Sequence, residues 1–323
     1  MAVTSVYPPT IVAADALSDT SGIHHVTGIV RDAQITVDWY VTVLGLQLVL
    51  QTVNFTDEFT RHLWFGDDTG SPGTVLTFFP YPDADDGRVG PPQISAAGLA
   101  IPPDAVGYWT DRLAANGVDA TEATRFGETV LRIRDPDGTP IDLVATPTPV
   151  DPRHDGPVDP RYAIRSIHGV TLHSTNSFVT ASVLDTLGCT LEGQDGDRVR
   201  YRASGHRATV FDLIDRDGPY GRAGTGTFHH VAVRVPNTDH LFGWHRLFRE
   251  RDYSVSRVMD RHFFHSLYVR EPGGILFELA TEQPGLSGDA REAGGQSLVL
   301  PPWLEVNRDV ITGQLPPLDV DHS

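Results

Sequence analysis

Apolar and polar residues alternate in short runs along this chain, and the runs recur in the same order in four stretches. The first stretch contains an alternating run, a helical pattern and three further strand-like runs, at 22–30, 33–44, 46–52, 62–65 and 74–79. Alternation with a period of two is typical of strands, and apolar residues three and four apart are typical of an amphipathic helix. The stretch therefore predicts a βαβββ unit.

Three later stretches repeat this plan, at about 93–146, 167–214 and 228–280. Self-similarity at a regular period indicates a fold built from repeated supersecondary units. We therefore predict an α+β protein made of four βαβββ modules.

The boundaries between parts of the chain follow its composition. Residues 1–21 are polar without periodicity and are expected to form an N-terminal arm, and the proline-rich segment 147–162 is expected to form a stiff linker. Modules 1 and 2 then occupy 22–146, and modules 3 and 4 occupy 163–282. The remaining tail, 283–323, has a glycine-rich run followed by Pro-Pro-Trp-Leu, and we expect it to cross a cavity mouth and exclude water.

The fourth unit carries candidate chemistry on two of its strands. Side chains alternate between faces in the run 228–235, so three valines share one face and His230 lies on the opposite face. In the last strand, the same alternation separates Glu278 from Phe277 and Leu279. A carboxylate among apolar neighbours is costly unless it is paired, hydrogen-bonded or metal-bound. His230 and Glu278 therefore form half of a candidate metal site.

The first unit supplies the other half, because His25 falls on His230 when the two units are aligned. A set of two histidines and one carboxylate with open coordination positions suits non-haem Fe(II) that activates oxygen. The inner units act as internal controls, with Ala96 and Gly169 at the histidine position. We therefore expect the outer units to pair around one metal and the inner units to pair with each other.

Composition limits the classes of function. The formal charge of −17 argues against nucleic acid or an anionic membrane as partner, because both attract basic patches. No apolar run approaches the roughly 20 residues that span a bilayer, and the N-terminus lacks a signal pattern. The single cysteine, Cys189, excludes an intrachain disulfide and agrees with a reducing compartment. We expect a cytoplasmic protein. Its acidic, lysine-free composition is what a salt-adapted cytoplasm or a GC-rich genome produces.

Ordered motifs run over nearly the whole chain. Besides the two His-His strands, they include Gly70–Thr74, Arg270–Gly274, Leu276–Thr281 and Leu300–Glu305. Together they resemble the vicinal oxygen chelate superfamily, which includes glyoxalases, bleomycin-resistance proteins and extradiol dioxygenases. The likeness is closest to its ring-cleaving dioxygenases of the hydroquinone 1,2-dioxygenase type.

The resemblance implies that the modules pair into two open barrels. It implies that His25, His230 and Glu278 bind Fe(II), with Mn(II) as the alternative metal. It assigns four further residues to the surroundings of the metal and the substrate: His24, His229, Arg261 and Tyr268. The implied partners are a small aromatic diol and O2, and the implied reaction opens a para-dihydroxy ring. Whether the chain forms a homo-oligomer is left open.

Three alternatives remain at this point. A catechol-type extradiol dioxygenase usually takes its ligands from the C-terminal half, but Gly169 breaks that arrangement here. A glyoxalase-type isomerase needs a fourth protein ligand, and the matching position is Thr77. A metal-free binding protein would not need three donors at metal spacing. Among the other histidines, His62 and His265 are expected to approach the cavity.

Overall fold

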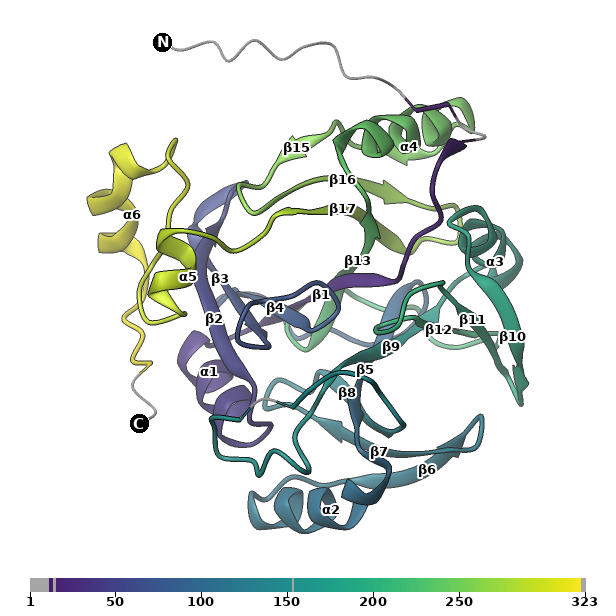
Figure 1. Ribbon diagram of the computed structural model, residues 1–323, viewed down its shortest axis with the longest axis horizontal. Helices are drawn as coiled ribbons and strands as arrows, with labels where there is room; N and C mark the ends of the chain where they lie inside the picture. The colour runs from purple at the N-terminus through teal and green to yellow at the C-terminus, as the bar shows by residue number, and fades with distance from the viewer. Residues whose placement is uncertain (1–11, 14–15, 153, 321–323) are drawn as a thin grey trace.

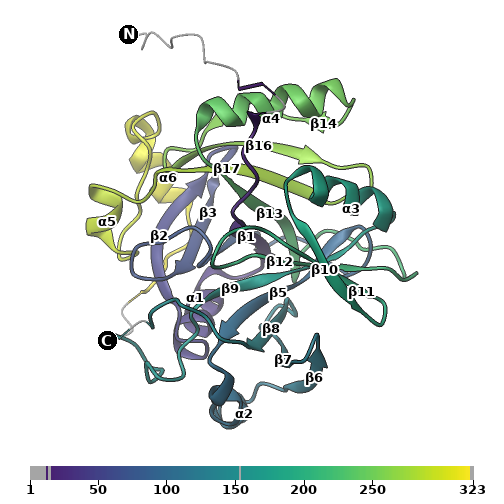
Figure 2. The same ribbon diagram turned by 45° about the vertical axis from the view of Figure 1, so that its right-hand side comes forward.

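The computed structural model describes residues 12–13, 16–152 and 154–320 (Figure 1). Most of the predicted N-terminal arm, residues 1–11 and 14–15, lies outside the described residues. The strands in the described part of the chain form two curled sheets, one of nine strands and one of eight. Figure 2 shows the helices of the four units on the outer surfaces of the two sheets. The predicted α+β class with two open barrels is confirmed.

The nine-stranded sheet joins the first and fourth units. Its strands are β1 (Ile23–Val30), β2 (Gln47–Asn54), β3 (Asp57–Gly66), β4 (Val75–Pro80), β13 (Thr227–Val235), β14 (Ser254–Val255), β15 (Met259–Asp260), β16 (Phe264–Arg270) and β17 (Leu276–Pro284). At its centre β1 pairs with β13 in antiparallel fashion, and each has a parallel outer neighbour, β4 and β17 respectively. The outer units therefore pair as the sequence predicts.

The eight-stranded sheet joins the second and third units with the same topology. Its strands are β5 (Gln93–Ile101), β6 (Thr121–Arg125), β7 (Glu128–Arg134), β8 (Pro140–Ala145), β9 (Ser166–His173), β10 (Thr190–Asp195), β11 (Arg198–Arg202) and β12 (Val210–Ile214). Here β5 and β9 form the central antiparallel pair, flanked by β8 and β12. The two halves of the sequence thus contribute one unit each to both sheets.

One helix per unit packs its apolar face on a sheet. The helical segments of the four units are α1 (Ala33–Thr42), η2 (Pro103–Ala105) with α2 (Val106–Ala115), α3 (Ser177–Thr186) and α4 (Thr238–Glu250). Asp32, Asn176 and Asn237 cap three of them by accepting a hydrogen bond from a backbone N–H three residues on. The side chains that these helices bury, such as Trp109 and Phe248, join the large core cluster. No described helix is both long enough and apolar enough to cross a membrane.

The C-terminal tail covers the free edge of β2. It contains α5 (Asp289–Ala293), η3 (Glu305–Asn307) and α6 (Arg308–Gln314). The Gln51 amide of β2 donates to the carbonyl of Gly295, and the Gln51 carbonyl accepts from the backbone N–H of Val299. The tail was expected to cross the cavity mouth. The ring of Trp303 packs against Phe55, a residue of the cavity lining, so the tail lies beside the cavity, and its crossing of the mouth stays a prediction.

A buried tyrosine and aspartate link the two sheets. Tyr40 of α1 is fully buried and donates from its hydroxyl to Oδ2 of Asp135, 3.0 Å away in the turn between β7 and β8. The other carboxylate oxygen accepts from the backbone N–H groups of Asp137 and Thr139. Burial raises the pKa of Asp135 from 3.8 to about 6, although these hydrogen bonds oppose the rise.

This shift predicts a pH dependence of stability. The folded state keeps the Asp135 proton up to a higher pH than the unfolded state, so stability is present at low pH and is lost as pH rises through about 6. Between pH 4 and 7 the wild type should lose about 2 kcal/mol through this group. D135N should remove that loss, measured as the difference in free energy of unfolding between variant and wild type across this range. The exposed Asp104→Asn is the control, and a D135N profile parallel to the wild type would contradict the assignment.

Candidate metal centre

His25, His230 and Glu278 converge at the centre of the nine-stranded sheet. They lie on β1, β13 and β17, three adjacent strands whose register pairs Ala232 with both His25 and Glu278. Oε2 of Glu278 lies 3.1 Å from Nε2 of His25 and 2.9 Å from Nε2 of His230. The two Nε2 atoms are 3.3 Å apart. Three potential ligand atoms from distant parts of the sequence therefore meet at one point.

The Glu278 carboxylate is buried without the partners that such a group normally requires. Its residue is 1% exposed, and neither oxygen makes a well-aligned hydrogen bond in the described part of the chain. The two imidazoles lie within hydrogen-bond distance of the carboxylate, but the angles of these contacts are not those of a hydrogen bond. An unsatisfied buried carboxylate costs several kcal/mol unless a cation compensates it. The carboxylate and two imidazoles form the donor set of a divalent metal site, so these residues fit such an ion.

The protonation states also suit metal binding. Burial lowers the pKa of His230, even though Glu278 opposes the shift. Burial alone would raise the pKa of Glu278, but His230 and His25 outweigh it and hold the pKa well below its ordinary value. Burial thus favours the neutral form of the His230 imidazole, and the two imidazoles favour the ionised form of Glu278; these are the forms that bind cations.

Each of these histidines has the preceding histidine as a hydrogen-bond partner. Nδ1 of His24 lies 3.0 Å from Nδ1 of His25, and Nδ1 of His229 lies 2.7 Å from Nδ1 of His230. An imidazole that directs a free Nε2 at a metal carries its proton on Nδ1 and donates it to such a partner. His24 and His229 are thus placed to fix the tautomer and ring orientation of His25 and His230.

A β-bulge explains why both histidines of the first pair are buried. In the pairing of β1 with β13, Ile23 and His25 are two residues apart on β1, whereas their partners are adjacent on β13. His24 is therefore the extra residue of the bulge. Simple alternation places His24 on the opposite face from His25. In the structure His24 is 5% exposed and its ring contacts Phe264, which also lines the cavity.

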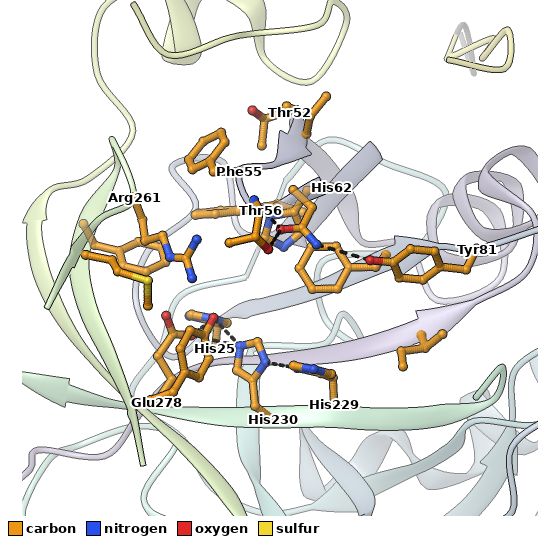
Figure 3. Close-up of a pocket in the computed structure, with 18 residues that line it drawn as sticks. His25, Thr52, Phe55, Thr56, His62, Tyr81, His229, His230, Arg261 and Glu278 are labelled. Carbon is orange, nitrogen blue, oxygen red and sulfur yellow. Dashed lines mark hydrogen bonds and ion pairs between the residues drawn. The ribbon is translucent and has the colours of Figure 1, made fainter. Parts of the chain in front are cut away.

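The three residues lie in the wall of a cavity of about 560 Å³, a size typical of small-molecule sites (Figure 3). Aromatic side chains make up much of its lining: Phe55, Trp64, Phe79, Tyr81, Phe264 and Tyr268. His229 opens onto the cavity, whereas His24 lies behind His25. An apolar, aromatic enclosure next to three metal donors suits a flat aromatic ligand.

Arg261 and Tyr268 both line the cavity, as expected for groups near a substrate oxygen. Tyr268 stands opposite Glu278 in the pairing of β16 with β17, and the Arg261 guanidinium lies 5.5 Å from the centre of its ring. Burial and the adjacent Glu278 raise the pKa of Tyr268 well above its ordinary value. Tyr268 therefore keeps its hydroxyl proton at neutral pH and can donate a hydrogen bond.

Of the two further histidines expected near the cavity, one lies there. His62 lines it, packed on the ring of Phe79, but His265 is not among the lining residues. The sequence interpretation also missed Thr27, whose hydroxyl lies 3.0 Å from Nε2 of His230 and 2.7 Å from the Thr77 hydroxyl. Its position two residues after His25, on the same strand face, was the available signal.

The equivalent region of the eight-stranded sheet holds ion pairs instead of metal donors. Asp212 accepts two hydrogen bonds from the Arg200 guanidinium, and Asp142 pairs with Arg125. At Gly169, which corresponds to His230, an added Cβ would lie 2.2 Å from the carbonyl oxygen of Val210. No side chain fits that position, so this sheet cannot repeat the site.

Comparisons with known proteins agree with this geometry. The family model of the Glyoxalase/Bleomycin resistance protein/Dioxygenase superfamily matches residues 22–143 and 183–279. The chain is 39% identical over 304 residues to the Bacillus subtilis (strain 168) protein named "Putative ring-cleaving dioxygenase MhqO", covering 93% of this chain and 97% of that protein. It is 31% identical over 300 residues to the "Chlorohydroquinone/hydroquinone 1,2-dioxygenase" of Sphingobium indicum, covering 89% of this chain and 94% of that protein.

A solved structure shares the whole architecture. The crystal structure of a "putative dioxygenase" from Bacillus subtilis subsp. subtilis str. 168 superposes with a TM-score of 0.91 at 38% identity, covering 95% of this chain and 100% of that one. Family model, relatives and solved structure agree, and this chain belongs to the Glyoxalase/Bleomycin resistance protein/Dioxygenase superfamily.

Proposed function

We propose that this protein is an Fe(II)-dependent dioxygenase that opens a para-dihydroxy aromatic ring with O2. The observation that carries the proposal is the buried Glu278 carboxylate, which lies between two imidazoles at the wall of an aromatic cavity without well-aligned hydrogen bonds. One relative is named as a ring-cleaving dioxygenase and another as a hydroquinone 1,2-dioxygenase, and these names support the reaction class.

His25, His230 and Glu278 would hold the metal, with Mn(II) as the alternative to Fe(II). Three protein ligands leave coordination positions open, and a redox-active ion supplies the electron transfer between an electron-rich ring and O2. The family as a whole implies a divalent metal, and these donors, two nitrogens and one oxygen, suit iron or manganese.

The remaining polar groups of the cavity would orient and polarise the diol. Tyr268 would donate a hydrogen bond to the reacting oxygen, and the Arg261 guanidinium would stabilise negative charge on it. With a metal on Nε2 of His230, His229 would accept the Nδ1 proton of His230, and its own Nε2 would then carry a proton to donate into the cavity. The aromatic walls would hold the ring and exclude water.

The para-diol is favoured by the Sphingobium indicum relative, named for chlorohydroquinone and hydroquinone. A catechol substrate remains the alternative within the same reaction class. The isomerase alternative is disfavoured because Thr77, at the fourth-ligand position, is engaged with the Thr27 hydroxyl instead of offering a carboxylate.

Replacement of a histidine that supports a ligand should weaken metal binding. His24→Ala removes the acceptor for the His25 Nδ1 proton, and loss of such a partner typically costs about 10–100-fold in metal affinity. Anaerobic equilibrium dialysis with Mn(II) or Fe(II) measures this directly. His168→Ala is the matched control, because His168 occupies the equivalent place in the third unit and pairs with Glu128. Equal affinities in both variants would remove the proposed role of His24.

Anaerobic reconstitution with Fe(II), followed by measurement of oxygen uptake, tests the reaction. Hydroquinone and methylhydroquinone should each consume one O2 per ring opened, and E278Q should lower kcat/KM at least about 100-fold, since metal charge stabilisation supplies several kcal/mol. Catechol and methylglyoxal hemithioacetal are assayed in parallel. Turnover of catechol alone would favour the extradiol alternative, and isomerisation of the hemithioacetal without oxygen uptake would overturn the proposal.

A further inference from the structure

Three polar side chains form a connected group in the cavity wall, away from the metal donors. Asn54 ends β2, Thr56 lies in the turn to β3, and Tyr81 directly follows β4. All three line the cavity, and Figure 3 shows Tyr81 on the side away from Glu278. None of them contributes to the donor set described above.

The hydrogen bonds of this group fix the orientation of the Asn54 amide. Its oxygen accepts from the backbone N–H of Thr56 at 3.1 Å and from the Thr56 hydroxyl at 2.8 Å. A backbone N–H can only donate, so the amide oxygen must face Thr56 and the amide nitrogen must face Tyr81. That nitrogen donates to the Tyr81 hydroxyl oxygen at 3.3 Å. An amide nitrogen has two hydrogens, so one remains for a ligand.

Besides this group and the metal donors, the cavity lining includes the polar Thr52 and His62 and several apolar and aromatic side chains. Ile29, Val53, Phe55, Phe79 and Phe264 contribute to the lining. A single six-membered ring does not fill a cavity of about 560 Å³, which is of the size that encloses a larger ligand. The cavity therefore suits a ligand with an aromatic centre and a polar group at each end.

Charge decides which polar group fits the second end. The charged side chains of the described lining, Arg261 and Glu278, belong to the metal end. At the second end, burial and the charge of Asp57 together raise the pKa of the Tyr81 hydroxyl, although hydrogen bonding to Asn54 and Thr60 opposes the rise. A negatively charged substituent would be repelled there, whereas a neutral oxygen could accept from the second hydrogen of the Asn54 amide, which the Tyr81 hydroxyl holds in place.

We propose that Asn54 and Tyr81 form a specificity subsite for a neutral, hydrogen-bonding substituent on the para-diol ring. Thr56 positions the Asn54 amide and does not itself determine specificity. The inference rests on the proposed function, because that function supplies the ring and its attachment at the metal end. The preferred substrate is then a hydroquinone with a short side chain that ends in a hydroxyl, carbonyl or ether oxygen.

Anaerobic dissociation constants of the metal-loaded protein test the subsite separately from turnover. Four ligands are compared by quenching of tryptophan fluorescence: hydroquinone, methylhydroquinone, 2-(2-hydroxyethyl)hydroquinone and 2,5-dihydroxyphenylacetate. The hydroxyethyl compound should bind about three- to tenfold more tightly than the methyl compound, the gain typical of one net hydrogen bond. The phenylacetate, which carries a carboxylate, should bind more weakly than the hydroxyethyl compound.

Two variants localise the effect. Tyr81→Phe and Asn54→Leu should each bring the ratio of hydroxyethyl to methyl affinity close to one. The surface variant Tyr220→Phe should keep the wild-type ratio, since that tyrosine is exposed and does not line the cavity. Tyr81→Phe is nearly isosteric, so it carries the test if Asn54→Leu does not fold.

The outcomes separate the two proposals. If hydroquinone binds and is opened but the hydroxyethyl and methyl compounds bind equally in the wild type, the subsite is overturned and the proposed function stands. A preference for the phenylacetate overturns the neutral character of the subsite. If no diol binds or reacts, the proposed function falls, and the subsite falls with it.

Discussion

The antiparallel pairing of β1 with β13 is the constraint on which the rest of this structure depends. It brings together residues from near the two ends of the chain, so that His25 and His230 face one another across two adjacent strands. The parallel neighbour β17 then adds Glu278 at the same level. A carboxylate that is 1% exposed would be strongly unfavourable on any strand without these imidazoles. The sheet order and the donor set are therefore consequences of the same pairing.

The two sheets have the same topology but differ in the polar groups at their centres. In the nine-stranded sheet the central carboxylate, Glu278, has no well-aligned hydrogen bond among the described residues, and a cavity adjoins it. In the eight-stranded sheet Arg200 satisfies Asp212 in a bidentate pair, and the backbone approaches Gly169 too closely for a side chain. The two sheets therefore share a scaffold, whereas the two-histidine, one-carboxylate donor set occurs in the sheet whose buried carboxylate is not paired with an arginine in the described residues.

The sequence was sufficient for the parts of the structure that local periodicity determines. Alternation placed His230 and Glu278 on a common face, and alignment of the units added His25, so the donor set followed without coordinates. The burial of His24 did not follow, because a β-bulge shifts the pairing at that residue and interrupts the alternation. The contact between Asn54 and Tyr81 was also not predicted, since both residues lie beyond the regular strand pattern and meet only because the sheet curls. The position of the tail depended on the free edge of β2, which no pattern within 283–323 encodes.

The energetics of the centre connect folding with function. Neither oxygen of Glu278 has a well-aligned hydrogen bond among the described residues. Its burial therefore makes the folded state less stable than an apolar side chain of the same volume would. A cation that binds the folded state and not the unfolded state offsets this loss of stability through its binding free energy. It thereby stabilises the protein by mass action. Unsatisfied groups are retained where a ligand completes them, and elsewhere, as at Asp212 and Asp135, the chain supplies the partner itself.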